Sequence, residues 1–309
     1  MSAIRIMFGA AAALAALTLV GHGSTVAAKP ERTLRPGQTV EWTADENPGE
    51  MRLRAGDMRI AVVPVREEEG LVGPRVTVFV PGKAPVTLDG DRAGLSFPSR
   101  ITVGRWDKAG ALYVMLESYT GGAHCCDHVQ VAVPDGAAMR VVDLGAYDGE
   151  RIERMPSDLD GDGIVDFAFR DDRFLYAFSS YADSYAPPLV LNVVDGKAVD
   201  VSARPGFRKL FEGELARTRK ACLASGKRAW EGSCPAFAAA SARVGRFDEA
   251  WGQMIARRGE VAGDGEWLPK GCTVKMDEEG MCPEGSEIVY KSYAEALRAF
   301  LVRTGYIER

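Results

Sequence analysis

The sequence changes character at Arg204-Pro205, and this change restricts the possible folds more than any other feature. Up to residue 202, short segments rich in β-branched and aromatic residues, such as "MRIAVVPV", "RVTVFV" and "ALYVMLESY", are separated by Gly, Pro, Asp or Asn. That pattern is typical of strands and turns. Asp195-Gly196 lies between two apolar runs and predicts a tight hairpin. Many short strands indicate a sandwich, a barrel or a partial propeller.

After this point, apolar residues recur at helical spacing instead. One stripe covers residues 207–222, a second covers 247–255, and "SYAE" at 292–295 predicts a capping box that opens a last helix. We therefore expect an α+β protein. An antiparallel β-rich domain, residues 29–203, would precede a small disulfide-bonded α-helical C-terminal unit, residues 204–309.

The N-terminus has the pattern of a secretory signal peptide. Arg5 gives a positive start, an apolar run extends from Ile6 to Val20, and small residues lead to Ala28. The run is shorter than the roughly 20 apolar residues of a membrane span, and no later segment is apolar enough. We expect cleavage near Ala28, a periplasmic or secreted protein, and no stable membrane insertion after cleavage.

Charge limits the classes of partner. Cleavage would remove one basic residue from the 38 basic and 43 acidic side chains of the full chain, which gives a net charge of −6. Nucleic-acid binders and general binders of anionic lipid need a basic face. The composition therefore argues against both classes.

All six cysteines follow the predicted signal peptide, in an oxidising setting that favours disulfides. Six cysteines allow 15 pairings, and the sequence alone does not choose among them. Cys222 and Cys234 flank a short connection, as do Cys272 and Cys282. If both of these pairs form, the adjacent cysteines at 125 and 126 have only each other.

An acidic loop, "DLDGDGIVD" at residues 158–166, carries carboxylates at its first, third, fifth and ninth positions and glycine at the sixth. This spacing can fold alternate side chains and one backbone carbonyl, that of Ile164, around a hard cation. An EF-hand would need glutamate at the twelfth position, where this chain has Phe169. The alternation that follows predicts a strand, so the loop enters a sheet.

The acidic loop resembles the calcium-binding loops of FG-GAP and VCBS-type repeats, over about a dozen residues of a single copy. The resemblance implies a structural Ca²⁺ ion whose side-chain ligands would be Asp158, Asp160, Asp162 and Asp166. The Phe-Gly and Gly-Ala-Pro elements that name the repeat are absent nearby. The alternative is a solvated turn that uses Asp and Gly for their backbone preferences.

A second group lies in "GGAHCCDH", between two predicted strands. His124, Cys125, Cys126 and His128 are candidate ligands for zinc or copper, with Asp127 nearby, but structural zinc sites space their cysteines by two to four residues. A redox pair would resemble Cys-x-x-Cys. A disulfide, either vicinal or to other cysteines, is the preferred interpretation.

The segment "DDRFLYAFSSYADSYAPP", residues 171–188, is rich in aromatic residues. A buried aromatic core is the preferred interpretation. A ligand-binding or partner-binding surface is the alternative.

Two functions remain open from the sequence. The first is an exported, calcium-stabilised, disulfide-bonded protein that is not an enzyme and binds an envelope component or a protein partner. The second is a periplasmic hydrolase or transition-metal enzyme that uses the tip from His124 to His128. No Gly-x-Ser-x-Gly or His-Glu-x-x-His motif supports the second function.

Overall fold

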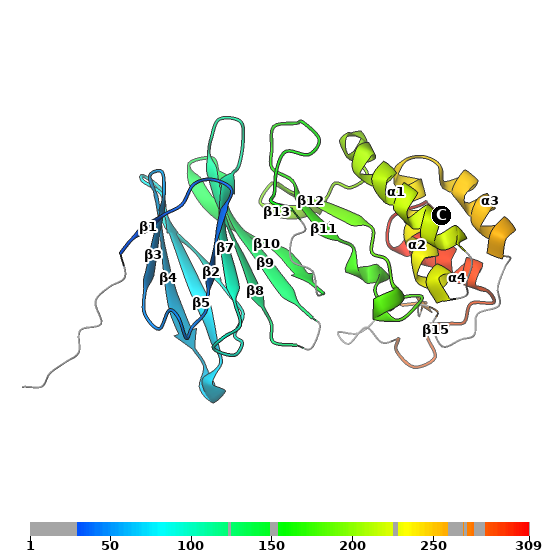
Figure 1. Cartoon of the computed structure of the whole chain (residues 1–309), viewed down its shortest axis with the longest axis horizontal. Coiled ribbons are helices and arrows are strands. Elements are labelled where there is room, and N and C mark those ends of the chain that lie inside the picture. Colours follow the sequence, from blue (N-terminus) through cyan, green and yellow to red (C-terminus); the bar gives the residue numbers. More distant parts are fainter. Residues whose placement is uncertain are drawn as a thin grey trace, which may run out of the picture.

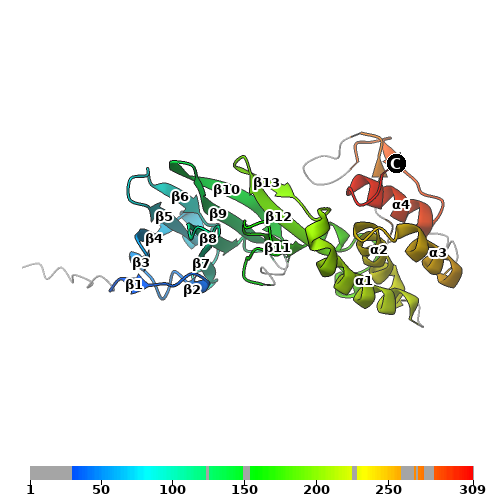
Figure 2. The ribbon, with the colours of Figure 1, turned by 90° about the horizontal axis from the view of Figure 1, so that it is seen from above.

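The computed structural model describes residues 30–122, 125–148, 154–224, 228–258, 268, 271–274 and 282–308. The predicted signal peptide and His124 lie outside the described residues. No helix within these ranges is both long enough and apolar enough to cross a membrane. Figure 1 shows the β-rich part at one end of the molecule and the helices at the other, and Figure 2 shows the same arrangement from above.

Two five-stranded sheets face each other in the N-terminal part. The outer sheet has the order β1 (Arg32–Thr33), β3 (Met51–Ala55), β4 (Met58–Arg66), β5 (Val72–Phe79) and β6 (Val86–Asp89). The inner sheet has the order β10 (Ala138–Tyr147), β9 (Asp127–Asp135), β8 (Leu112–Tyr119), β7 (Ser99–Arg105) and β2 (Gln38–Trp42). All pairings in these sheets are antiparallel except the short parallel pairing of β1 with β3.

A shared apolar core makes the two sheets a sandwich. Leu53 and Val76 of the outer sheet and Ile101 and Val114 of the inner sheet are all fully buried in one cluster. Along β3 the burial alternates strictly, as expected for a strand with one face in the core and the other in water. Of the three β architectures that the sequence left open, the structure has the sandwich.

A third, smaller sheet covers the other face of the inner sheet. It contains β11 (Phe167–Arg170), β12 (Pro188–Val194) and β13 (Lys197–Asp200). Phe167 and Leu191 pack with Tyr113 of β8, whereas Val190, one residue before Leu191, belongs to the core of the helical part. Because successive side chains of a strand point to opposite faces, this sheet joins the sandwich to the helices.

The hairpin between β12 and β13 is confirmed. Asp195 and Gly196 have φ values of 50° and 73° and connect the two strands directly. Two residues with positive φ are the requirement of a type I′ turn.

The helical unit contains α1 (Arg208–Leu223), α2 (Arg228–Arg243), α3 (Phe247–Arg258) and α4 (Tyr293–Arg303), with a short ribbon of β14 (Gly271–Cys272) and β15 (Glu287–Ile288). Short 3₁₀ turns occur at η1 (Glu68–Gly70), η2 (Asp172–Phe174), η3 (Tyr181–Asp183) and η4 (Pro205–Phe207). The predicted α+β class, with an antiparallel β-rich part before a helical unit, is confirmed.

Helix α2 is the one described helix that the periodicity of the sequence did not predict. Its residues from Gly232 to Ser241 are all buried, so no polar face interrupts the apolar one. This stretch consists mostly of alanine and other small residues, so it lacks the spaced large apolar side chains that indicated the other helices.

The predicted cap of α4 is present in modified form. The Ser292 hydroxyl accepts a hydrogen bond from the Glu295 backbone N–H at 3.1 Å. The Glu295 carboxylate accepts from the backbone N–H of Lys291 at 2.7 Å, one residue earlier than a capping box requires.

Two disulfides tie the helical unit together as the cysteine spacing indicated. Cys222 at the end of α1 is bonded to Cys234 in α2, and Cys272 is bonded to Cys282. The predicted boundary at 203/204 stays a prediction. The core of the helical unit also takes in Phe174, Phe178 and Val190, which precede that boundary.

Candidate functional site

The acidic loop lies where the sandwich, the small sheet and the helical unit meet. Isolated bridges pair Asp107 with Ile164 and Ser157 with Asp166, and they tie the loop to the connection after β7 and to the start of β11. Gly163, the sixth residue of the loop, has a φ of 98°, a conformation that side chains other than glycine rarely adopt.

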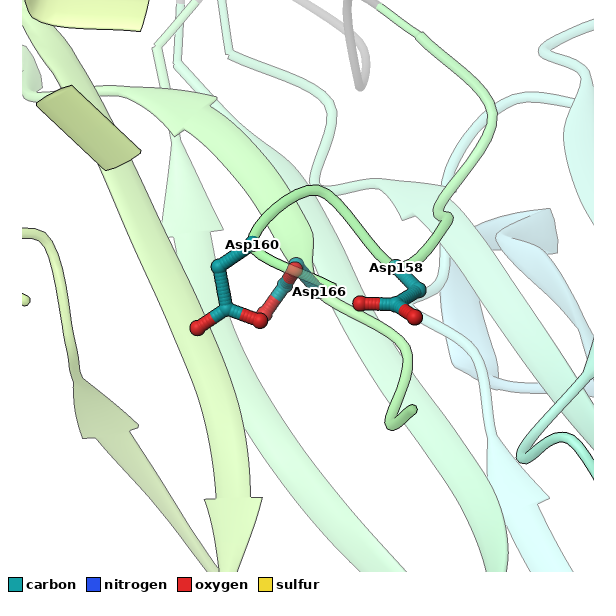
Figure 3. Close-up of side chains that lie close together, drawn as sticks. All are labelled: Asp158, Asp160 and Asp166. Atoms are coloured by element: carbon teal, nitrogen blue, oxygen red, sulfur yellow. The ribbon is translucent and has the colours of Figure 1, made fainter. Parts of the chain in front are cut away.

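Three of the predicted ligands lie together. Carboxylate oxygens of Asp158, Asp160 and Asp166 all lie within 4.8 Å of one another. Figure 3 shows the carboxylates of Asp158 and Asp160 directed towards Asp166. Asp162 is not in this group: its carboxylate accepts from the Ile164 backbone N–H at 2.8 Å. Ile164 itself is held by its bridge to Asp107.

The donor chemistry of this acidic triad fits a hard cation. Asp166 is fully buried, and each of its two carboxylate oxygens accepts one hydrogen bond, from the Leu159 N–H at 2.7 Å and from the Asn192 amide at 2.5 Å. Each carboxylate oxygen has a second lone pair that a cation can use. Desolvation raises the pKa of Asp166, and the charges of Asp160 and Asp162 raise it further. A bound cation would offset this repulsion.

Sequence reasoning missed the basic side chains that surround the loop. Lys108 donates to the Gly161 carbonyl at 3.1 Å, and its ammonium lies 3.5 Å from the Asp158 carboxylate. Arg204 lies 3.7 Å from Asp162 and donates to the Asn192 side chain at 3.1 Å. Both come from distant parts of the chain, so no local pattern could have indicated them.

The loop also packs against the beginning of the helical unit. A Cβ atom at Gly206, in η4, would lie only 2.3 Å from the Cβ of Asp160. Together with the pair between Arg204 and Asp162, this close approach connects the loop to the segment that leads into α1. An ordered loop therefore supports the junction between the β-rich part and the helices.

The second candidate group is built around His128, at the start of β9. Its Nδ1 lies 2.8 Å from Asp91 Oδ2, and its Nε2 lies 3.1 Å from Asp143 Oδ1. The buried Ser118 hydroxyl donates to the same Asp91 oxygen at 2.8 Å. Asp91, Ser118 and Asp143 come from three different strands or loops, which is why the sequence pattern did not reveal them.

This arrangement differs from that of a hydrolytic triad. A nucleophilic serine needs the histidine as its hydrogen-bond acceptor. Here the Ser118 hydroxyl is bonded to Asp91, and both ring nitrogens of His128 face carboxylates. The two carboxylates favour the protonated form of the ring.

The tip that precedes His128 is closed by a disulfide between the adjacent Cys125 and Cys126. The Thr120 hydroxyl accepts from the Cys126 N–H at 2.7 Å, and a Cβ at Gly122 would overlap the Cys125 carbonyl. All six cysteines are therefore paired. In this disulfide form the tip offers no thiolate to zinc or copper, so the transition-metal alternative requires reduction of this bond. Asp127 pairs with Tyr119 and Tyr147 in the inner sheet.

The aromatic segment 171–188 lies partly in the core. Phe174 and Phe178 are buried, and Asp171 binds Arg173 through two contacts of 2.6 Å and the Tyr306 hydroxyl at 3.0 Å. Tyr176 is 49% exposed, the most exposed aromatic residue of the segment. Phe174 and Phe178 fit the preferred interpretation as core, and the alternative of a binding surface at the remaining aromatic residues stays a prediction.

The His128 group predicts a specific pH dependence of stability. Its hydrogen bond to Asp91 raises the pKa of His128 despite partial burial, and the charges of Asp91 and Asp143 add to the shift. A raised folded-state pKa contributes stability that is complete below the unfolded value of about 6.5 and is lost as pH rises through the folded value. Between pH 6 and pH 8.5, the wild type should lose more unfolding free energy than His128→Gln in urea titrations. Asp91→Asn should reduce the pH dependence in the same way, and equal slopes in all three proteins would contradict the assignment.

Comparison with known proteins places the chain in a family. A family described as "sll0997 C-terminal domain" matches residues 211–305, which cover nearly all of the helical unit. The "Probable thylakoid lumen protein sll0997" of Synechocystis sp. (strain ATCC 27184 / PCC 6803 / Kazusa) is 30% identical over 279 residues, which cover 88% of this chain and 80% of that protein. The chain belongs to the sll0997 family.

A second relative is similar to this chain over only part of its own length. The "Uncharacterized protein y4bJ" of Sinorhizobium fredii (strain NBRC 101917 / NGR234) is 30% identical over 196 residues, which are 63% of this chain and 30% of that protein. No solved structure matches the chain. The similarity to sll0997 over most of both chains shows that the family extends beyond the helical domain.

Proposed function

We propose that this protein is exported, is not an enzyme, and binds an envelope component or a protein partner. In this proposal a structural calcium ion in the acidic loop holds the β-rich part and the helical unit together. The observation that carries the proposal is the convergence of Asp158, Asp160 and Asp166. The name of the relative sll0997 places that protein in the thylakoid lumen. An exported location for this chain is the corresponding expectation, in agreement with its N-terminal sequence.

The ion's role follows from the position of the loop. Asp160 packs against Gly206, Asp162 pairs with Arg204, and Asp166 holds Asn192 of β12. Fixing the three carboxylates of the triad would therefore fix the small sheet and the entry to α1 relative to each other. A Ca²⁺ ion would be held by protein oxygens, which suits a structural role better than a catalytic one.

The hydrogen bonds of His128 also favour a non-catalytic protein over a hydrolase. A general base needs an unprotonated nitrogen that faces substrate. Both nitrogens of His128 are engaged by Asp91 and Asp143, and Ser118 donates to Asp91. The His128 group is better suited to join β8, β9 and β10 at one end of the inner sheet.

Calcium should stabilise the mature, disulfide-intact protein measurably. At a free concentration of about 100 times the dissociation constant, binding to the folded state alone adds about 2.7 kcal/mol. The melting temperature after treatment with chelator should therefore rise by on the order of 5 °C when Ca²⁺ is restored. Native mass spectrometry should detect one bound ion per chain.

The matched variants are Asp158→Asn with Asp160→Asn, which remove two charges of the triad, and Asp45→Asn with Asp57→Asn, which remove two charges elsewhere in the β-rich part. The first pair should abolish the calcium response, and the second should leave it intact. A protein that binds no Ca²⁺ at millimolar concentration would exclude the structural ion. Rapid turnover of ester or peptide substrates that depends on His128 would favour the hydrolase instead.

A further inference from the structure

A pocket in the helical unit is separate from both groups described above. It has a volume of about 570 Å³ and lies between α1 and α3, with α2 beneath. Its deepest residues are apolar and buried: Leu215, Phe237, Val244 and Ala250. The volume falls within the range of roughly 300–1,000 Å³ that is usual for small-molecule sites.

The mouth of the pocket is polar and is spanned by a chain of hydrogen bonds. Arg219 of α1 donates to the Gln253 side chain of α3 at 2.9 Å, and Gln253 donates to Glu249 at 3.0 Å. Glu249 also accepts two hydrogen bonds from Arg246, at 2.8 and 2.9 Å. The Glu249 carboxylate is thus already bound by the Arg246 guanidinium, whereas Arg219 contacts the neutral amide of Gln253.

The charge of Arg219 therefore has no carboxylate partner within the described part of the chain. The remaining rim cation, Arg208, pairs with Glu212 on its own helix at 2.9 Å. Of the charged residues around the pocket, three are arginines and two are glutamates, which leaves an excess of one positive charge. An apolar floor below one uncompensated guanidinium favours a ligand with an apolar body and a single anionic end.

We propose that this pocket binds a small amphipathic carboxylate, a medium-chain fatty acid, with its hydrocarbon chain over Leu215 and Phe237 and its carboxylate on Arg219. Burial of the chain supplies most of the affinity, because apolar surface leaves water. The guanidinium orients the ligand through hydrogen bonds to the carboxylate. Displacement of the neutral Gln253 side chain costs less than the rupture of a buried ion pair would.

The test uses the full mature protein and decanoate, below its micelle concentration, in isothermal titration calorimetry. One saturable site is expected. Ala216→Trp should abolish binding, because Ala216 is an exposed residue of α1 that lines the pocket. Lys209→Trp places the same side chain on an exposed position of α1 outside the pocket and should bind decanoate like the wild type.

The charge is tested separately. Arg219→Gln should weaken decanoate binding about tenfold, since a charge-assisted hydrogen bond is lost. Lys220→Gln removes the same charge one residue away, outside the pocket, and should have little effect. Decanol should bind the wild type more weakly than decanoate.

Three results would overturn the proposal: no saturable site, equal binding by Ala216→Trp and the wild type, or equal losses for Arg219→Gln and Lys220→Gln. The calcium site shares no residue with the pocket. Either proposal can therefore fail without the other.

Discussion

Asp166→Ala is expected to lower the free energy of unfolding by about 2–4 kcal/mol, the cost of leaving one buried and one partly buried donor without their acceptor. The Leu159 N–H and the Asn192 amide both donate to the Asp166 carboxylate, which is fully buried. The same substitution should abolish stabilisation by Ca²⁺, since it removes a member of the triad. Urea unfolding of chelated and calcium-loaded protein measures both effects.

Asp162→Ala is the matched control, because Asp162 belongs to the same loop and its side chain is 37% exposed. Its pair with Arg204 is exposed on both sides, and such pairs contribute about 0–1 kcal/mol. The variant should therefore cost under about 1 kcal/mol in chelated protein. If both variants lose the same free energy of unfolding in the presence of chelator, Asp166 does not hold the loop as inferred. If Asp162→Ala also loses the calcium response, Asp162 joins the ligand set once the ion is bound.

Phe178→Ala is expected to cost about 3–5 kcal/mol, the usual range for truncation of a buried phenylalanine. Phe178 is 1% exposed, and its ring meets the edges of Tyr293 at 5.2 Å and Phe300 at 5.3 Å between centroids. Both partners belong to α4. Thermal unfolding followed by circular dichroism should show the loss in the transition that melts the helices.

Tyr176→Ala tests the same segment at its exposed position. Tyr176 is 49% exposed, and its ring lies 5.4 Å from that of Tyr181 between centroids. Its truncation should cost less than about 1 kcal/mol, as is usual for surface changes. Equal losses for Phe178 and Tyr176 would mean that the aromatic segment is not part of the helical core.

The Phe178 contacts bear on the limits of the helical domain. The family match begins at residue 211, inside α1. The core that this domain encloses also contains Phe174, Phe178 and Phe207. We therefore expect a fragment of residues 211–305 to fold less stably than one that begins near residue 171.

Local features of this fold could be predicted from the sequence because they depend on neighbouring residues. The hairpin at Asp195-Gly196 requires only two residues that tolerate positive φ, and the acidic loop carries its turn glycine within itself. The short separations of Cys222 from Cys234 and of Cys272 from Cys282 indicated these two pairs, and the structure selected them among the 15 possible pairings. The sequence by itself thus determined the α+β class, the strands and the turns.

The tertiary structure alone decided which distant residues meet. His128 contacts Asp91, 37 residues away in the sequence, and Asp166 accepts a hydrogen bond from Asn192, 26 residues away. Gly206 approaches Asp160 because η4 passes the loop, and Arg219 meets Gln253 because α1 lies beside α3. Such contacts depend on how sheets and helices pack, and packing is set by the summed burial of many side chains rather than by any local pattern. The turn of the acidic loop could therefore be predicted from the sequence, whereas the surroundings of His128 and the pocket over Phe237 could not.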